Sequence, residues 1–364
     1  MPENDSKIFT LMVEPYGDCN LRCCHCYYDL QNGSVMGIED FTLVVEKVAH
    51  YIEKKGFRKI HFIWHGGEPL LAGINFFRQA IGIINNTISQ VQQRHFIQTN
   101  GLLLDDEFCR FFRDMNVEVG ISLDGPPDLH DRLRVDSNGN GTHAAVMVKI
   151  RLLEKHHVPL GFNAVISRAG IGHEQRLYRF FQEMGYGFRV NPIIPGRNQD
   201  ILDEYLFQKG EYGEFLCRLF DMWTHTETRR INVSPLDIYL RSVLDDETSE
   251  CQHQHSCVGT HIGIRPSGEA VLCSRFQNHG FGNILKKSMA DIVSSLSSRQ
   301  IKSRANALND CRSCENWSIC HGGCPCNSVA CGHSLMEKDP FCKDYQIIFA
   351  HIRSVLMDFK QKTI

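Results

Sequence analysis

The stretch that decides the fold is Cys19-Asn20-Leu21-Arg22-Cys23-Cys24-His25-Cys26, which follows an apolar, β-rich run at 9–13. Three of its thiols, those of Cys19, Cys23 and Cys26, have the spacing C-x3-C-x2-C. On a loop after a strand, three sulfurs can converge without distorting a regular element. A cubane [4Fe–4S] cluster needs four ligands, so three cysteines leave one iron open for a small molecule. A zinc site completed by His25 or Cys24 is the alternative, although zinc ligands usually occur as two separated pairs.

The chain downstream of this stretch alternates between β-rich and helical segments. Strands are expected at 9–13, 60–64, 95–98, 117–122, 160–166 and 188–192. Helices are expected at 41–54, 76–91, 105–115, 144–156, 174–184 and 210–224. Strands separated by helices of this length predict successive βα units and an α/β fold with a parallel sheet. Six units are too few for a closed eight-stranded barrel but enough for an open one, with its site at the carboxyl ends of the strands.

Composition excludes several classes of protein. The chain has 364 residues, of which 42% are hydrophobic, so it can bury a core, and its length predicts two domains. A net charge of −3 provides no field for non-specific nucleic-acid binding. No apolar run is long enough to span a bilayer and no signal pattern is present, so a cytoplasmic location is expected. Sixteen cysteines in a reducing compartment indicate metal binding or redox chemistry.

The cysteine stretch, together with Gly66-Gly67-Glu68-Pro69 after the second expected strand, resembles the radical S-adenosylmethionine (SAM) superfamily. The resemblance implies a partial (βα)6 barrel in which Cys19, Cys23 and Cys26 hold a catalytic [4Fe–4S] cluster whose open iron chelates SAM. The reduced cluster then splits SAM into methionine and a 5′-deoxyadenosyl radical, which abstracts a hydrogen atom from the substrate. The glycine pair permits close backbone approach, and the Glu68 carboxylate suits the ammonium group of SAM.

Further SAM contacts are implied by the same resemblance. Ser122, at the end of the fourth expected strand, is similar to the family's ribose or carboxylate contact, and Asn163 ends the fifth. Arg134 is a candidate clamp on the SAM carboxylate, because its planar fork binds carboxylates bidentately. His65 precedes the glycine pair, where related sulfatase-maturating enzymes often carry glutamine. An ordinary turn at the glycine pair and an exposed Arg134 are the alternatives.

A second cysteine array fills the C-terminal part of the chain. It reads Cys251-x5-Cys257-x10-Gly268-x4-Cys273, then Cys311-x2-Cys314-x5-Cys320-x3-Cys324, and finally Cys342. Taken alone, eight thiols suit either two four-cysteine clusters or two zinc sites.

The full pattern of the array resembles the SPASM extension of radical SAM proteins. The resemblance implies one auxiliary [4Fe–4S] cluster on Cys251, Cys257, Cys273 and Cys324, and a second on Cys311, Cys314, Cys320 and Cys342. The nearby Cys326 and Cys331 leave the last ligand open. We therefore expect a radical SAM partial barrel at 1–232, followed by a bridging segment and the SPASM domain at 233–364.

The combination of the two resemblances implies a maturase of peptides or proteins. One reading is a sulfatase maturase, which oxidises cysteine or serine to formylglycine. The other is a maturase that cross-links a ribosomally made precursor peptide, such as a cyclophane-type C–C bond at an aromatic residue. Sulfatase maturases usually carry a basic aspartate directly after the third auxiliary cysteine, whereas this chain has Ser274. Serine is too weak a base, so the cross-linking reading is favoured.

The expected cofactors are three [4Fe–4S] clusters and SAM. The expected partners are the precursor peptide and an electron donor such as flavodoxin or ferredoxin, with no nucleic acid and no membrane. A remote alternative is a zinc-binding protein without redox function.

Overall fold

The computed structural model describes residues 8–31, 33–196, 204–226, 229–276 and 279–362. Within them, seven strands pair in parallel and in chain order, so the expected parallel sheet is confirmed. These strands are β1 (Ile8–Tyr16), β2 (Lys59–Gly66), β3 (Gln92–Thr99), β4 (Val117–Ser122), β5 (Leu160–Ile166), β6 (Phe188–Pro192) and β7 (Val233–Ser234). The six strands predicted from the sequence correspond to β1 to β6.

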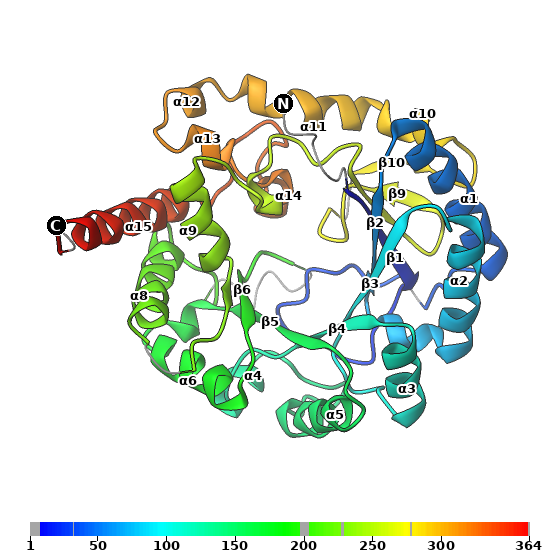
Figure 1. The fold of residues 1–364 in the computed structure, drawn as a ribbon, viewed down its shortest axis with the longest axis horizontal. Coiled ribbons are helices and arrows are strands. Elements are labelled where there is room, and N and C mark those ends of the chain that lie inside the picture. Colours follow the sequence, from blue (N-terminus) through cyan, green and yellow to red (C-terminus); the bar gives the residue numbers. More distant parts are fainter. Residues whose placement is uncertain (1–7, 32, 197–203, 227–228, 277–278, 363–364) are drawn as a thin grey trace.

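Helices connect successive strands and cover the outside of the curved sheet (Figure 1). They are α1 (Ile38–Lys55), α2 (Ile74–Thr87), α3 (Asp106–Asp114), α5 (His143–Lys155), α6 (Glu174–Met184) and α8 (Glu211–His225), with a short α4 (Pro127–His130). All six predicted helices are confirmed. The second ends earlier than its predicted bound, Val91, because buried Ile88 continues the apolar pattern into the turn after the helix.

The two faces of the sheet differ in chemistry. Phe9, Leu11 and Val13 of β1 are fully buried in the hydrophobic core, and β2, β4 and β5 likewise alternate between buried and half-buried residues. A sheet with both faces in an apolar core would read as a continuous apolar run. The alternation arises because one face packs on helices while the other lines the polar interior of the barrel, where Gln98, Ser122 and Asn163 meet.

The C-terminal part extends the same sheet on its other side. Strand β8 (His261–Ile264) pairs in parallel with β1, and β9 (Glu269–Val271) and β10 (Gly280–Asn283) follow antiparallel. The sheet of the described residues is therefore mixed, with ten strands in the order β10-β9-β8-β1-β2-β3-β4-β5-β6-β7. β7 to β10 each have two to four residues, too few for a recognisable sequence pattern. The two expected domains thus share one sheet, and a boundary at residue 232 stays a prediction.

The remaining tail consists of short helices, which close the gap in the barrel wall (Figure 1). They are α9 (Leu236–Asp245), α10 (Met289–Val293), α11 (Leu296–Ala307), α12 (Asn309–Arg312), α13 (Trp317–Cys320) and α14 (Pro325–Ala330), with the 3-10 turn η3 (Cys251–His253), and they are followed by the long α15 (Cys342–Lys362). Two further 3-10 turns, η1 (Pro69–Ala72) and η2 (Arg168–Gly170), follow β2 and β5 in the barrel. Helix α15 packs on α8, where a side chain at Gly213 would collide with the Asp344 backbone at 2.7 Å. Among the described residues, no helix has the length and apolar character required to cross a bilayer.

Candidate functional site

The first cysteine loop lies between β1 and α1. Its backbone is held against the segment after α4, because the Arg22 and Cys24 N–H groups donate to the Val135 and Leu133 carbonyls at 2.9 Å. Burial raises the pKa of Cys19 to about 12, with a further contribution from Glu68. Burial likewise raises the pKa of Cys23 to about 11. These thiols are protonated at neutral pH when no metal is bound, so metal binding must displace their protons.

The glycine pair that follows β2 holds this loop in place. A Cβ at Gly67 would lie 2.2 Å from the Asp18 carbonyl oxygen, so any residue other than glycine would push the two loops apart. The Glu68 N–H donates to the same carbonyl at 2.9 Å. The backbone at the glycine pair is therefore closely approached, as predicted. The approaching group in the structure is the cysteine loop, and an approach by SAM stays a prediction.

Glu68 is almost fully buried and links three segments. Its carboxylate accepts from Thr99 Oγ1 at 2.7 Å, from the Asn100 N–H at 2.9 Å and from the Leu70 N–H at 3.1 Å. Burial raises the pKa of Glu68 to about 7, although these three donors oppose the shift. Its proximity to Cys19 places it beside the cysteine loop. Contact with the SAM ammonium group stays a prediction.

Polar side chains from three neighbouring strands form one network in the barrel interior. Gln98 Nε2 donates to Ser122 Oγ at 2.9 Å, and Asn163 Nδ2 donates to Gln98 Oε1. Gly120 lies below this network, where a Cβ would approach Gln98 Oε1 to 2.6 Å. The structure thus brings the two predicted residues Ser122 and Asn163 together. The bridging residue, Gln98, was not predicted to link them, because the pairing depends on the register of β3, β4 and β5.

Arg134 is buried, so the alternative of an exposed arginine is wrong. Its Nε and Nη2 donate to Asp124 at 2.6 and 3.0 Å, and Asp124 also accepts from the Val165 N–H at 2.7 Å. Burial by itself would raise the pKa of Asp124, but the Arg134 guanidinium lowers it below its ordinary value. Arg134 also lies near Cys23 and Cys26, so its positive charge faces the cysteine loop. Its role as a SAM clamp stays a prediction.

Two histidines beside the site are neutral at pH 7: His25 is buried and His65 is partly buried. Burial lowers the pKa of His25, between the last two cysteines, to about 4. Burial also lowers the pKa of His65 to about 4, and its Nδ1 accepts from the Gly66 N–H at 2.8 Å. That hydrogen bond places the proton of His65 on Nε2, which makes the side chain a hydrogen-bond donor there.

The eight cysteines of the C-terminal array divide between two cavities. Cys251, Cys257, Cys273 and Cys324 line one of them, together with Cys326. Cys311, Cys314, Cys320 and Cys342 line the other. Cys331 lines neither of the two. The structure therefore groups the cysteines as the resemblance implies, and their service as cluster ligands is a proposal.

Two buried charged residues organise the loops that carry these cysteines. Arg304 of α11 donates to the carbonyls of Leu335, Gly323, Gly322 and Glu337 at 2.6 to 3.1 Å. Asp339 accepts from the Cys324 N–H and Asn327 Nδ2, both at 2.8 Å, and from the Phe341 N–H at 2.9 Å. Sequence reasoning missed both residues, because nothing in the spacing of a lone arginine or aspartate indicates which distant carbonyls or amides it meets.

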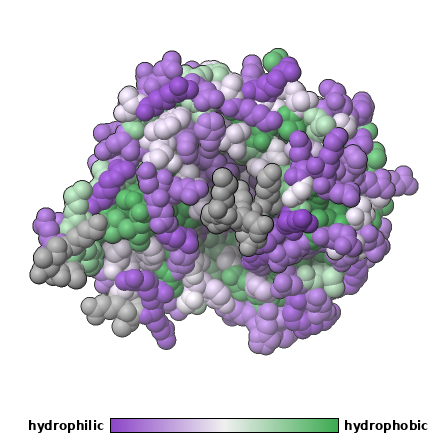
Figure 2. Space-filling view, turned by 45° about the horizontal axis from the view of Figure 1, so that its top comes forward, coloured by the Kyte–Doolittle hydropathy of each residue, from purple (hydrophilic) through white to green (hydrophobic). Residues whose placement is uncertain are grey.

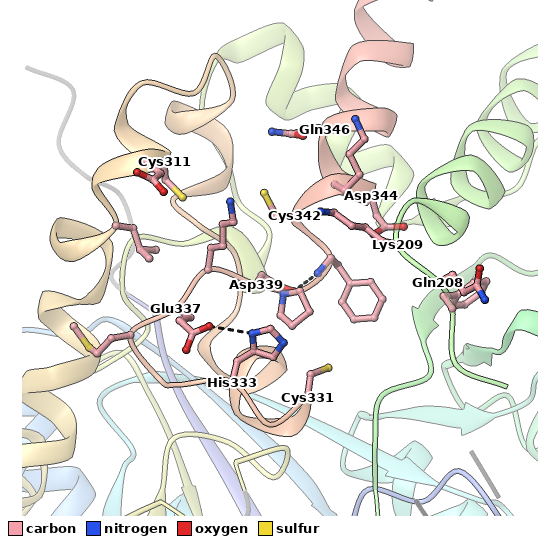
Figure 3. Close-up of a pocket in the computed structure, with 18 of the residues that line it drawn as sticks. Gln208, Lys209, Cys311, Cys331, His333, Glu337, Asp339, Cys342, Asp344 and Gln346 are labelled. Carbon is pink, nitrogen blue, oxygen red and sulfur yellow. Dashed lines mark hydrogen bonds and ion pairs between the residues drawn. The ribbon is translucent and has the colours of Figure 1, made fainter. Parts of the chain in front are cut away.

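A cavity of about 940 Å³ lies where the tail faces the barrel (Figure 3). Gln208 and Lys209 come from the segment before α8, and His333, Glu337 and Asp339 come from the loop between α14 and α15. His333 Nδ1 and Glu337 Oε2 are paired at 3.1 Å on its wall. Cys311 and Cys342 also line it, so it borders the second group of cysteines. Figure 2 shows that the molecule is hollowed near its centre, with a largely hydrophilic surface around the hollow.

Two protein families match the chain, one over the first cysteine loop and one over part of the C-terminal cysteine array. Residues 13–172 match the radical SAM superfamily, and residues 251–315 match an iron–sulfur cluster-binding domain called SPASM. The chain thus contains a radical SAM domain followed by a SPASM domain. It is similar to the serine-type anaerobic sulfatase-maturating enzyme of Bacteroides thetaiotaomicron, with 27% identity over 99% of this chain and 92% of the relative. The cysteine-type enzyme of Clostridium novyi is 26% identical over 94% of this chain and 95% of its own.

Solved structures share the fold of this radical SAM protein. A sulfatase-maturating enzyme with bound SAM and a peptide, anSMEcpe, aligns with a TM-score of 0.84 at 22% identity, covering 98% of this chain and 100% of the other. The Streptococcus suis protein SuiB bound to its precursor peptide SuiA aligns with a TM-score of 0.63 at 16% identity. This alignment covers 91% of this chain and 74% of SuiB. The partial barrel with its C-terminal SPASM domain is therefore confirmed.

This chain is thus a radical SAM/SPASM maturase, homologous to anaerobic sulfatase-maturating enzymes, and its cofactors are [4Fe–4S] clusters and SAM. The residues present fit these groups. Iron–sulfur clusters require thiolate ligands, and the cysteines gather in one loop and two cavities. Among the described residues, no three His, Cys, Asp or Glu side chains surround the position of a single metal ion.

Proposed function

We propose that this maturase acts on a ribosomally made precursor peptide and forms a C–C cross-link at an aromatic residue. The observation that carries the proposal is the environment of position 274. Ser274 is almost fully buried, and its hydroxyl lies 3.3 Å from the Tyr27 hydroxyl. Burial raises the pKa of Tyr27, so its phenol stays protonated at neutral pH. The next residue, Arg275, is a cation.

The absence of a carboxylate at this position matters for the choice of reaction. Formylglycine formation removes a proton from the target thiol or hydroxyl, for which sulfatase maturases use an aspartate after the third auxiliary cysteine. Neither a serine hydroxyl nor a protonated phenol accepts a proton readily at neutral pH. Cross-linking to an aromatic ring removes a ring proton from a radical adduct, where restoring the aromatic ring drives the loss.

The chain's residues contribute binding and orientation to this reaction. Cys19, Cys23 and Cys26 are the proposed ligands of the catalytic cluster. SAM itself is proposed to contact Glu68, Ser122, Arg134 and Asn163. When bound, the cluster supplies the electron that cleaves SAM to the 5′-deoxyadenosyl radical. The peptide loses one hydrogen atom to that radical. When the new bond forms, the peptide also loses a proton and an electron, and an auxiliary cluster on the tail cysteines is the proposed acceptor of that electron. A reducing partner such as flavodoxin or ferredoxin is part of the proposal.

We propose that the peptide binds in the 940 Å³ cavity between the barrel and the tail. This cavity is large enough for several side chains and offers Lys209, Lys338 and Lys343 together with the apolar Leu206 and Phe207. The anSMEcpe and SuiB structures contain bound peptides, which supports a peptide substrate for this chain as well.

Formylglycine formation remains the second candidate, because similarity to sulfatase-maturating enzymes extends over 94–99% of this chain. The two are separated by incubating reconstituted enzyme, SAM and reductant with two peptides. One is encoded by a short reading frame beside the gene and contains aromatic residues; the other is a sulfatase-type peptide with the target serine or cysteine.

The expected result is a product two hydrogens lighter from the first peptide. It should resist fragmentation between the joined residues in tandem mass spectrometry and should not react with a hydrazide probe. Because conversion of serine to formylglycine also removes two hydrogens, the hydrazide reaction decides between the candidates. A hydrazide-reactive product from the sulfatase-type peptide, with the first peptide unchanged, would overturn the proposal.

A further inference from the structure

Five cysteines, and not four, line the cavity of the first auxiliary group. Beside the four predicted ligands lies Cys326, in the first turn of α14 and two residues after Cys324. Its side chain is 2% exposed, whereas Cys324 is 8% exposed, Cys257 and Cys273 are partly exposed and Cys251 is exposed. A cubane of this type takes four cysteines, and the fifth needs an explanation.

The distance between two of these sulfurs supplies one. Cys326 Sγ lies 3.4 Å from Cys273 Sγ. Two thiolates bound to one tetrahedral metal ion through bonds of about 2.3 Å lie roughly 3.8 Å apart. Thiolates on different irons of a cubane lie farther apart than this. Cys273 and Cys326 are therefore close enough to bind the same iron, which accepts only one protein ligand in a cubane of this type.

The surroundings of this corner hold both thiols in place. The Arg275 guanidinium lies beside Cys324, Cys326 and Cys273, where it balances thiolate charge. It also donates to Asn327 Oδ1, which holds α14 against the segment that follows β9. The two cysteines thus come from two separate segments of the chain and meet beside one cation.

We propose that Cys273 and Cys326 are interchangeable ligands of a single iron in the first auxiliary cluster. In the exchange, the incoming thiol gives up its proton and forms an iron–sulfur bond, while the displaced thiolate leaves the iron and takes up a proton. No electron is transferred. Cys251, Cys257 and Cys324 are the proposed ligands of the other three irons. Cys326 also has a side-chain hydrogen bond to Cys324, and its Sγ lies 3.4 Å from that of Cys273. The proposal holds whichever peptide reaction the enzyme performs.

The test uses the full-length protein, reconstituted anaerobically, with iron and sulfide counted per chain. The variants are Cys273→Ala, Cys326→Ala, their double variant, and Cys257→Ala as a ligand without a substitute. Cys331→Ala, at the end of α14 and outside the cavity, is the matched control. Three cubanes give about twelve iron atoms. Both single variants and the control should retain about twelve, whereas Cys257→Ala and the double variant should retain about eight.

Loss of about four iron atoms from either single variant would overturn the proposal, since one thiol would then be indispensable. Retention of all twelve in the double variant would overturn it too. The SAM-induced change in the EPR signal of the N-terminal cluster reports whether each variant is folded. Should an alanine variant lose that change, Cys273→Ser and Cys326→Ser, which nearly preserve side-chain volume, decide by the same iron count.

Discussion

The two cysteine-bearing regions of this enzyme rest on different supports. The first loop is held by strand ends: Gly67 lies under Asp18, and Glu68 joins β2 to β3. The C-terminal cysteines lie on loops and short helices, held from inside by Arg304 and Asp339. One hydrophobic core extends through both regions, but the cysteine-bearing loops of the tail depend in addition on these buried hydrogen bonds. We therefore expect the two regions to fail separately when their supports are removed.

The largest effect should come from the first loop. Replacing Cys19, Cys23 and Cys26 with alanine should reduce 5′-deoxyadenosine production below detection, because no ligands remain for the cluster that activates SAM. Iron should fall from about twelve to about eight atoms per chain, since the tail is untouched. Chromatography for 5′-deoxyadenosine and iron analysis measure both. Cys24→Ala, in the same loop but packed near Leu133 and Ile193, should retain activity; its loss would contradict the assigned ligand set.

The tail should be destabilised most by Arg304→Ala. This change removes one donor from four carbonyls, of which Gly322 and Glu337 keep a second donor. Leu335 and Gly323 lose the donor shown here, and at about 1–2 kcal/mol for each of these two the tail loses about 2–4 kcal/mol. Auxiliary iron should decline while SAM cleavage persists. Arg312→Ala, which removes an exposed arginine bonded to Asn306, is the control. Equal iron loss in both variants would argue against the proposed support.

In the barrel, Asp124→Asn should lower the free energy of unfolding by about 3–4 kcal/mol, because Arg134 is then left buried without its counter-charge. Urea unfolding of the metal-free protein measures this. Asp128→Asn breaks an ion pair with Arg176 whose side chains are about half exposed, and should cost less than about 1 kcal/mol. Similar losses in the two variants would indicate that burial of the Asp124 pair contributes little.

A pH-dependent contribution comes from Glu14 on β1, which is fully buried and accepts from the Tyr28 hydroxyl at 2.9 Å. Burial raises the pKa of Glu14 from 4.5 to about 7. Between these two pH values the folded protein binds a proton at Glu14 that the unfolded chain has released. The fold therefore has its full stability below about pH 4.5, and part of the free energy of unfolding is lost as the pH rises through about 7.

At pH 8, Glu14→Gln should therefore have a free energy of unfolding about 2–3 kcal/mol higher than that of the wild type, and it should unfold at a higher urea concentration. Near pH 4.5 the two proteins should be equally stable. Glutamine keeps an acceptor for Tyr28. Exposed Glu39→Gln should show no such pH dependence. A constant difference between Glu14→Gln and wild type at all pH values would show that the carboxyl does not titrate in this range.

The smallest effect is expected at the barrel–tail contact. Ser274→Ala removes the hydroxyl that meets Tyr27, a neutral interaction of about 1 kcal/mol, and peptide turnover should fall by less than about tenfold. Initial rates of cross-linking measure this. A loss of several hundredfold, with 5′-deoxyadenosine still formed, would mean that Ser274 handles a proton after all.

The sequence by itself determined the fold class and the groups of cysteines. Apolar residues recur at helical and strand spacing because each βα unit must bury one side, and that periodicity is visible without coordinates. The cysteine spacings were equally readable, since loops of fixed length bring sulfurs together locally. Similarity to known maturases agrees with both inferences.

The tertiary structure decided what each side chain meets. The sequence did not indicate that Arg134 pairs with Asp124, that Gln98 joins Ser122 to Asn163, or that β8 pairs with β1. It also left Cys326 equivalent to Cys331, whereas folding places one sulfur 3.4 Å from Cys273 and the other outside that cavity. These contacts join residues from separate elements, and their positions depend on strand register and helix packing, which a local pattern of residues does not encode.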